Sequence, residues 1–171
     1  VGECLPDSSN AWTSLSVAPP ADVFELSFVA IPLASPMSGV TGLAWGEAQA
    51  WSDVACAVRF NPNGEIDVRD GDAYRNDSVI PYVVGQAYRV RMNVNLPAHT
   101  YDVFVTAPGE AETSLAAGYA FRSEQGSIAR IDTLVMRSDQ GAHRVCELEL
   151  TTGPSGTGGT AGTGGGTGGT G

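Results

Sequence analysis

Residues 54–106 read VACAVRFNPNGEIDVRDGDAYRNDSVIPYVVGQAYRVRMNVNLPAHTYDVFVT and contain two turn signals, NPNG at 61–64 and LPAHT at 96–100. Apolar and polar side chains alternate on both sides of the second turn, in RVRMNVNL before it and YDVFVT after it. A period of two places successive side chains on opposite faces of a β-strand. Asn63 and Gly64 favour the positive φ angles of a tight hairpin turn. The stretch therefore predicts antiparallel hairpins with one face toward a core and one toward water.

The rest of the chain repeats this pattern in shorter runs, with almost no helical periodicity. Further strands are predicted at 12–17, 21–34, 40–45, 128–137 and 143–150. The polar residues 69–78 are expected to form a long loop, and residues 109–127 a mixed segment that crosses between sheets. Many short strands separated by frequent turns predict an all-β domain, a two-sheet antiparallel jelly-roll sandwich.

The composition changes abruptly after Thr152, where the sequence becomes GPSGTGGTAGTGGGTGGTG. Glycine and threonine bury little apolar surface, so residues 153–171 are expected to be a linker or tail outside the core. Residues 1–152 are assigned to the sandwich domain. A linker of this kind predicts a neighbouring domain as a partner, and the alternative is a tail that packs against another protein.

Charge excludes several classes of partner. The net charge is −10, and an acidic surface repels both nucleic acid and anionic membrane. Every basic residue is an arginine, which removes lysine Schiff-base and P-loop chemistry. No apolar run reaches the length of about 20 residues that spans a bilayer.

Three cysteines leave the disulfide pairing open, because an odd number weakens any prediction of a disulfide framework. Cys4 and Cys146 lie near the two ends of the predicted domain, where terminal strands of a sandwich often run side by side. A Cys4–Cys146 disulfide and free thiols are equally compatible with this spacing. Cys56 lies within the apolar run VACAVRF and is expected to be a buried thiol.

Three segments resemble a known family: DVACAVRFNPNGEIDVRDGDAY, IPYVVGQAYRVRMNVNLPAHTYDVFVTAPG and YAFRSEQ. They lie within residues 24–148 and are similar to concanavalin-A-like, or laminin-G-like, jelly-roll modules of secreted bacterial polysaccharide-active proteins. The resemblance implies a secreted, extracellular, non-catalytic module that binds or positions polysaccharide. It brings no established binding residues with it. The Gly/Thr-rich tail fits the same modular organisation.

Carbohydrate binding would use aromatic rings that stack on sugars, with planar polar groups beside them. Candidate ligand-binding residues in or beside the irregular segments are Trp45, Trp51, Tyr74, Arg75 and Tyr82. Outward-facing Arg89 and Arg91 form a second candidate surface, where two guanidinium groups can receive the carboxylates of an acidic polysaccharide. The alternative is that neighbouring acidic side chains satisfy these arginines within the sheet.

An oxygen-rich loop suggests a metal site. Asp70, Asp72, Asn76 and Asp77 cluster in one polar segment, and Ca²⁺ selects six to eight oxygen ligands of this kind. The spacing does not match an EF-hand, because no glutamate follows at the required position. Calcium is therefore the one cofactor considered, and a simply solvated acidic loop is the alternative.

Catalytic signals are weak, and no enzyme activity is expected. FRSEQ at 121–125 is superficially similar to the arginine-bearing strand of jelly-roll alginate lyases, which combine a Tyr/His pair with Arg and Gln. The glutamine-x-histidine strand and the lysine-bearing tyrosine strand of those lyases are absent. His99, in a predicted turn, is expected to be solvated. The main alternative function is a structural or adhesive subunit of an extracellular assembly, and a polysaccharide lyase is the weaker one.

Overall fold

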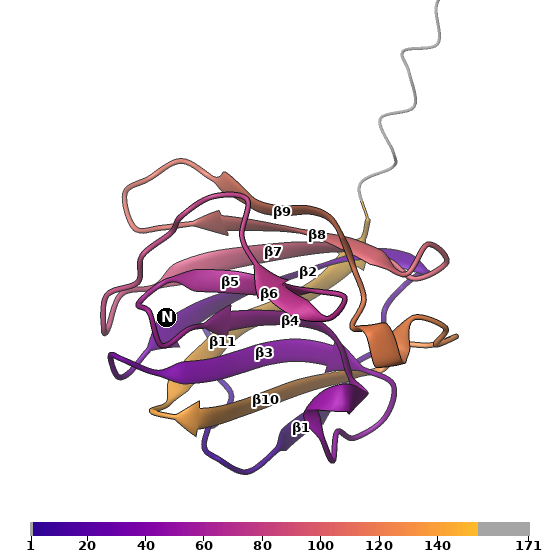
Figure 1. Cartoon of the computed structure of the whole chain (residues 1–171), viewed down its shortest axis with the longest axis horizontal. Coiled ribbons are helices and arrows are strands. Elements are labelled where there is room, and N and C mark those ends of the chain that lie inside the picture. Colours follow the sequence, from indigo (N-terminus) through magenta and orange to yellow (C-terminus); the bar gives the residue numbers. More distant parts are fainter. Residues whose placement is uncertain (1, 154–171) are drawn as a thin grey trace, which may run out of the picture.

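The computed structural model describes residues 2–153, and these residues form a β-structure with two single turns of 3₁₀-helix (Figure 1). The predicted Gly/Thr-rich tail lies outside the described residues, except for Gly153. The strands are β1 (Thr13–Ser16), β2 (Val23–Pro32), β3 (Ser38–Ala44), β4 (Val54–Phe60), β5 (Ile66–Asp70), β6 (Ala73–Arg75), β7 (Tyr88–Asn95), β8 (Thr100–Thr106), β9 (Thr113–Ala120), β10 (Thr133–Gln140) and β11 (His143–Thr152). The two 3₁₀ turns are η1 (Trp51–Asp53) and η2 (Ser123–Gln125).

The strands form two antiparallel sheets that pack face to face. A six-stranded sheet has the order β1-β10-β3-β4-β5-β6, and a five-stranded sheet has the order β11-β2-β7-β8-β9. In Figure 1 the six-stranded sheet lies in front of the five-stranded one. The two-sheet antiparallel sandwich predicted from the alternating pattern is therefore confirmed.

The main core fills the space between the two sheets. Phe24, Leu26 and Phe28 of β2 alternate with less buried neighbours and are almost fully enclosed. Met92 of β7 and Leu43 of β3 join the same apolar cluster. Each such side chain contributes about 1.5–3 kcal/mol by leaving water. β2 lies between β11 and β7, in the interior of its sheet.

A second apolar cluster lies on the outer face of the six-stranded sheet. It contains Val40, Ala44, Ala48, Val54, Ala57 and Val135, and the aromatic rings of Trp12, Trp51 and Tyr74 pack against it. Gly42 is needed beneath this cluster, because a Cβ atom there would lie 2.4 Å from the carbonyl oxygen of Cys56. The outer face of this sheet is therefore lined by aromatic rings as well as by polar side chains.

Two segments predicted to be irregular contain strands. The polar residues 69–78 include β6, which pairs with β5 across a tight turn where Gly71 has a φ of 58°. Residues 109–127 include β9, the edge strand beside β8, whose alternation is interrupted by register shifts. Both segments are therefore more regular than predicted. The sequence did not indicate these strands, because short strands with bulges or polar turns lack a sustained period of two. After β9 the chain crosses to the other sheet, as predicted.

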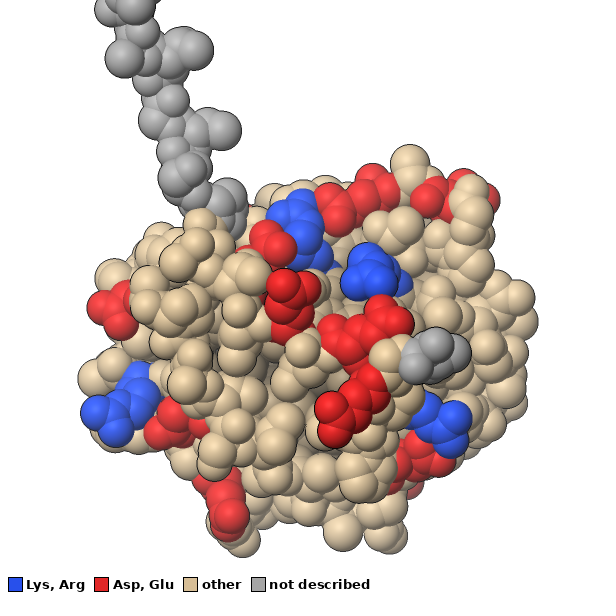
Figure 2. Space-filling model, turned by 180° about the vertical axis from the view of Figure 1, so that it is seen from behind, with Lys and Arg blue, Asp and Glu red and all other residues tan. Residues whose placement is uncertain are grey.

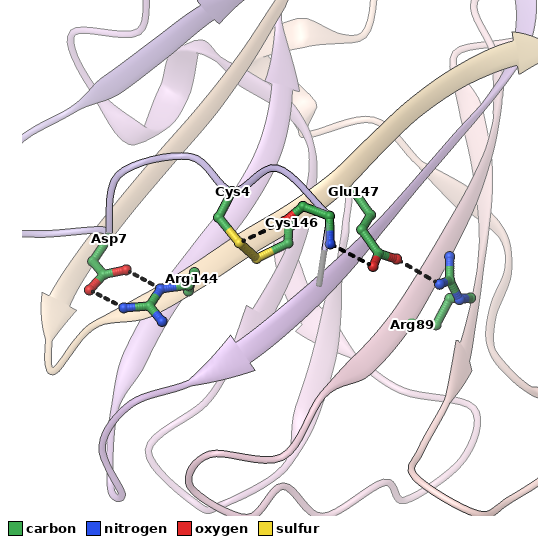
Figure 3. The surroundings of a disulfide bond; sticks show 7 residues. Cys4, Asp7, Arg89, Arg144, Cys146 and Glu147 are labelled. Atoms are coloured by element: carbon green, nitrogen blue, oxygen red, sulfur yellow. Dashed lines mark hydrogen bonds and ion pairs between the residues drawn. A yellow bond between two sulfur atoms is a disulfide. The ribbon is translucent and has the colours of Figure 1, made fainter.

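The N-terminal segment closes one side of the sandwich (Figure 3). The main-chain nitrogens of Leu5 and Ser8 donate to the carbonyl oxygens of Val145 and His143, both 2.9 Å away. Cys4 and Cys146 form a disulfide, and Asp7 pairs with Arg144 at 2.7 Å. The pairing left open by the sequence is thus settled. The segment also covers part of the β11 edge, which would otherwise present unpaired peptide groups.

Cys56 is buried and not disulfide-bonded, as predicted. Burial raises its pKa well above the usual range, so the thiol stays protonated and inert in the folded protein. Within residues 2–153 no helix has the length and apolar character needed to cross a membrane.

Candidate functional site

A pocket of about 260 Å³ lies on the outer face of the six-stranded sheet, beside the second apolar cluster. We call it the outer-sheet pocket. It is lined by Ser38, Val40, Trp51, Arg59, Arg69, Tyr74, Arg122 and Asp139. These residues come from β3, β4, β5, β6, β10, η1 and the residue before η2.

Strand register brings the pocket together. Arg137 of β10 lies opposite Val40 of β3, and Val40 lies opposite Arg59 of β4. Arg59 in turn lies opposite Asp67 of β5, which completes one row across four strands. Residues directly opposite one another share a face of the sheet. Because Val40 belongs to the apolar cluster on the outer face, the whole row points outward. The neighbouring pair on β5 and β6 is Arg69 and Tyr74.

Arg59 is held on two sides. Its Nε and one terminal amino group donate to the two carboxylate oxygens of Asp67, at 2.9 and 2.7 Å. Asn61 Nδ2 donates to the same carboxylate at 3.0 Å. The guanidinium carbon also lies 3.8 Å from the ring centroid of Tyr74. A bidentate ion pair together with a cation–π contact fixes both the arginine and the tyrosine ring.

Hydrogen bonds that involve main-chain atoms anchor both Arg69 and Arg122. Tyr101 of the other sheet donates its hydroxyl hydrogen to the carbonyl oxygen of Arg69, and Arg69 Nε donates to Gly71 O at 3.0 Å. The main-chain nitrogen of Arg122 donates to Ala55 O at 2.9 Å, and its Nε donates to Val54 O at 3.1 Å. The two guanidinium groups are therefore positioned by the sandwich itself.

Trp51 forms the aromatic end of the pocket. Its ring meets that of Trp12 edge to face, with centroids 4.8 Å apart. The Arg137 guanidinium carbon lies 5.8 Å from the Trp51 ring centroid, and Arg137 pairs with Asp139 at 3.2 Å. Gln125 of η2 donates to Ser52 O at 2.7 Å, which ties the two 3₁₀ turns together.

Burial shifts two titrations in the pocket. Desolvation raises the pKa of Tyr74, so its hydroxyl is neutral at ordinary pH. Desolvation lowers the pKa of Arg122, although an arginine remains charged at any ordinary pH. Arg122 is only 6% exposed. The pocket thus combines a neutral phenol with buried positive charge.

Of the residues predicted to bind ligand, Trp51 and Tyr74 lie together in this pocket. Trp45 follows the end of β3, is 52% exposed and lies outside the lining. Arg75 lies on the exposed edge strand β6, 3.9 Å from Asp70. Tyr82, predicted to bind ligand from a position in or beside an irregular segment, is instead buried. Its ring packs on Phe60 in the core, and its hydroxyl donates to Asn61 O at 2.6 Å.

Arg89 and Arg91 lie on the opposite sheet and are paired by neighbouring carboxylates, which was the alternative expectation. Arg89 pairs with Glu147 at 2.9 Å. Arg91 pairs with Glu112 at 2.6 Å and with Glu25 at 3.1 Å. Figure 2, which shows the molecule from behind, displays arginines interspersed with carboxylates rather than an uncompensated basic patch.

The four proposed calcium ligands do not converge. Asp70 accepts a hydrogen bond from Ala120 N, and Asp77 accepts from Ala117 N and from the Tyr119 hydroxyl. Asn76 donates to Glu65, and Asp72 lies in the turn between β5 and β6. Within residues 2–153 no three His, Cys, Asp or Glu side chains are grouped as a metal site. Asp70 and Asp77 instead attach the β5–β6 hairpin and the residues that follow it to β9.

His99 is also placed differently from the prediction. It has a φ of 54°, as suits a turn, but its ring is half-buried against Phe121 and its Nε2 lies 2.8 Å from Ile128 O. Arg59, Arg69 and Arg122 were not predicted as site residues. The outward phase of Arg59 and Arg69 in their strands could have indicated two of them. Arg122 belongs to FRSEQ, the segment with a superficial similarity to a lyase strand, but no local pattern indicates that it is buried.

Comparisons with known proteins agree with this architecture. No family model matches the chain. A gellan lyase from Bacillus sp is 29% identical over 133 residues, which is 76% of this chain and 5% of that enzyme. The chain therefore spans about 5% of the length of this curated relative.

Among solved structures, lectin UEA-II in complex with galactose has a TM-score of 0.54 at 12% identity, covering 81% of this chain and 77% of the lectin. The catalytic domain of a glycoside hydrolase family 131 protein from Coprinopsis cinerea has a TM-score of 0.52 at 11% identity, covering 77% and 57%. At these identities the likeness establishes a shared fold.

Proposed function

We propose that this protein is a polysaccharide-binding module and that its ligand occupies the outer-sheet pocket. The observation that carries the proposal is the position of Trp51 and Tyr74 beside three arginines on an exposed sheet face. Aromatic rings stack on sugar faces, while guanidinium groups donate to hydroxyl and carboxylate oxygens. The similarity to a gellan lyase supports a polysaccharide ligand, with gellan as one candidate.

We also propose that the module is secreted. Disulfides such as Cys4–Cys146 persist in oxidising compartments outside the cytosol. An extracellular location would bring the module to polysaccharide, and the Gly/Thr-rich residues 153–171 would connect it to a neighbouring domain.

The module is proposed to be non-catalytic. The raised pKa of Tyr74 makes it a poor general base at neutral pH. Asp67 and Asp139 are each held in an ion pair with an arginine. His143 is buried in the sandwich, and His99 lies in the β7–β8 turn. None of these groups is poised for proton transfer in the pocket.

Binding can be tested with a panel of polysaccharides that includes gellan, by affinity electrophoresis and then isothermal titration calorimetry. Trp51→Ala is expected to weaken binding about five- to thirtyfold, because a stacking surface worth about 1–2 kcal/mol is lost. Trp45→Ala is the matched control, since Trp45 is exposed but outside the pocket. Thermal unfolding should show that both variants fold.

Failure of the wild-type protein to bind any member of the panel would contradict the proposal. Equal binding by the Trp51 and Trp45 variants would contradict the location of the site. Catalysis is tested by incubating the protein with gellan and following the ultraviolet absorbance of the unsaturated product of a lyase. A flat trace is expected, and a rising one would overturn the non-catalytic part of the proposal.

A further inference from the structure

The arginines differ in whether a carboxylate neutralises them. Six of the nine form an ion pair: Arg59, Arg75, Arg89, Arg91, Arg137 and Arg144. Within residues 2–153, Arg69, Arg122 and Arg130 have no such partner. Two of these three line the outer-sheet pocket. The protein has 19 acidic residues, so carboxylate partners for its arginines are plentiful. Two arginines without an ion-pair partner in the same pocket therefore distinguish this site.

Arg122 is the more unusual of the two. The residue is only 6% exposed, so its charge has lost most of its contact with water. Glu124, two residues further along, is exposed and forms no ion pair with it, although its negative charge still acts on Arg122 and favours the charged guanidinium. Burying a charge that has no ion-pair partner is costly. A bound anion would offset this cost.

The two guanidinium groups are oriented before any ligand arrives. In both arginines Nε donates to a main-chain carbonyl, that of Gly71 for Arg69 and that of Val54 for Arg122. The Tyr74 hydroxyl also acts on the Arg122 guanidinium, and the remaining terminal amino groups of the two forks can donate to other partners. A planar carboxylate matches the flat edge of a guanidinium and accepts two parallel hydrogen bonds from it.

The other charged residues of the pocket lining each have an ion-pair partner. Arg59 is paired with Asp67, and Asp139 is paired with Arg137. Arg69 and Arg122 are therefore the charged lining residues without an ion-pair partner, and both are positive. Trp51 lies in the same lining and offers an aromatic surface to a sugar ring.

We propose that the outer-sheet pocket binds the carboxylate of a uronic acid residue through Arg69 and Arg122, with the sugar ring against Trp51. The inference rests on the proposed function and names its ligand class. It also places acidic-polysaccharide recognition on the sheet opposite to Arg89 and Arg91, whose charges are already neutralised.

The test compares ligands that share a backbone and differ in charge. Polygalacturonate and its fully methyl-esterified form are such a pair, alginate is a second uronate polymer, and dextran sulfate carries a different anion. The wild-type protein should bind at least one uronate polymer and should bind the methyl ester about tenfold or more weakly. Dissociation constants are measured by calorimetry at one fixed salt concentration, because salt screens charge.

Arg69→Gln removes one guanidinium without burying a new charge and should weaken uronate binding about tenfold or more. Arg122→Lys keeps the buried charge but loses the planar fork, and it should also weaken binding. Arg89→Gln, on the far sheet, should leave the affinity unchanged. If the Arg122 variant fails to fold, the comparison of the Arg69 and Arg89 variants decides the result.

Equal affinity for polygalacturonate and its methyl ester would overturn the inference, as would an Arg69 variant that binds like the Arg89 variant. Tighter binding of dextran sulfate with the same dependence on Arg69 would replace carboxylate by sulfate as the ligand group. In each case, binding of another polysaccharide that still depends on Trp51 would support the proposed function. Absence of any Trp51-dependent binding would contradict both the proposed function and the uronate inference.

Discussion

At the scale of single residues, the two faces of β4 show how one strand serves both the core and the pocket. Val58 and Phe60 point into the main core, while Arg59 between them points outward to Asp67 and Tyr74. This alternation is visible in the sequence VRF and follows from strand geometry alone. The identity of the partners is not visible, because Asp67 and Tyr74 reach Arg59 only through strand pairing.

His143 is a second residue whose surroundings have a measurable consequence. Its ring is buried, with Nδ1 2.8 Å from Ser8 Oγ and Nε2 2.9 Å from Thr41 Oγ1. Burial lowers its pKa from the usual 6.5 to about 4, although the charge of Asp7 acts in the opposite direction. The folded protein therefore holds this histidine neutral at pH values where the unfolded chain protonates it.

We predict that the free energy of unfolding falls as the pH drops from about 6.5 to about 4. Above this pH window His143 is neutral in both the folded and the unfolded protein, and below it His143 is protonated in both. Its effect on the free energy of unfolding is therefore confined to the window. The expected loss is about 3 kcal/mol from this group. Urea unfolding at several pH values measures it, and His143→Gln should flatten the slope. A wild-type slope near zero across the window would contradict the prediction.

At the scale of elements, the N-terminal segment and β11 behave as one unit. The segment forms main-chain hydrogen bonds to β11 through Leu5 and Ser8, and Cys4 joins it covalently to Cys146 (Figure 3). Ser138 N donates to Ser9 O at 2.7 Å, so the segment also reaches β10 in the other sheet. It therefore connects the two sheets at their edge.

Replacing both Cys4 and Cys146 by serine should lower the free energy of unfolding by about 2–5 kcal/mol, because the disulfide spans 142 residues and restricts the unfolded chain. Amide hydrogen exchange at Leu5 and Ser8 should accelerate more than exchange in β2. A reductant should destabilise the wild-type protein and leave the double variant unaffected. Unchanged stability in the double variant would contradict this account of the segment.

The strands with a sustained period of two were predictable from the sequence, and those without it were not. β2, β7 and β8 alternate over seven or more residues and lie where expected. β6 has three residues and follows a polar turn, so composition alone favoured a loop. In β11 a bulge near Glu147, which has a φ of 54°, changes which residues face the core. No simple alternation predicts such a bulge.

The candidate site was only half predictable for a related reason. Trp51 and Tyr74 could be proposed because aromatic residues in irregular segments suggest ligand contact. Arg89 and Arg91 were the natural choice for an anionic ligand, yet Glu147, Glu112 and Glu25 pair with them from other strands. The arginines that remain uncompensated are identified only once all ion pairs are known.

At the scale of the whole molecule, charge and aromatic surface are distributed unevenly. The outer face of the five-stranded sheet carries arginines already paired with carboxylates (Figure 2), whereas the outer-sheet pocket carries two without carboxylate partners. A net charge of −10 repels an anionic polymer at long range. At physiological salt this repulsion is screened beyond about 8 Å, so contacts inside the pocket decide binding.

The central claim is that polysaccharide meets the outer face of the six-stranded sheet. It is tested most directly by nuclear magnetic resonance of the labelled protein during titration with oligogalacturonate. The account predicts that the indole signal of Trp51 and the main-chain signals of Arg59, Arg69 and Arg122 shift together and saturate. Shifts confined to β2, β7 and β8, or to the loop that carries Trp45, would contradict it.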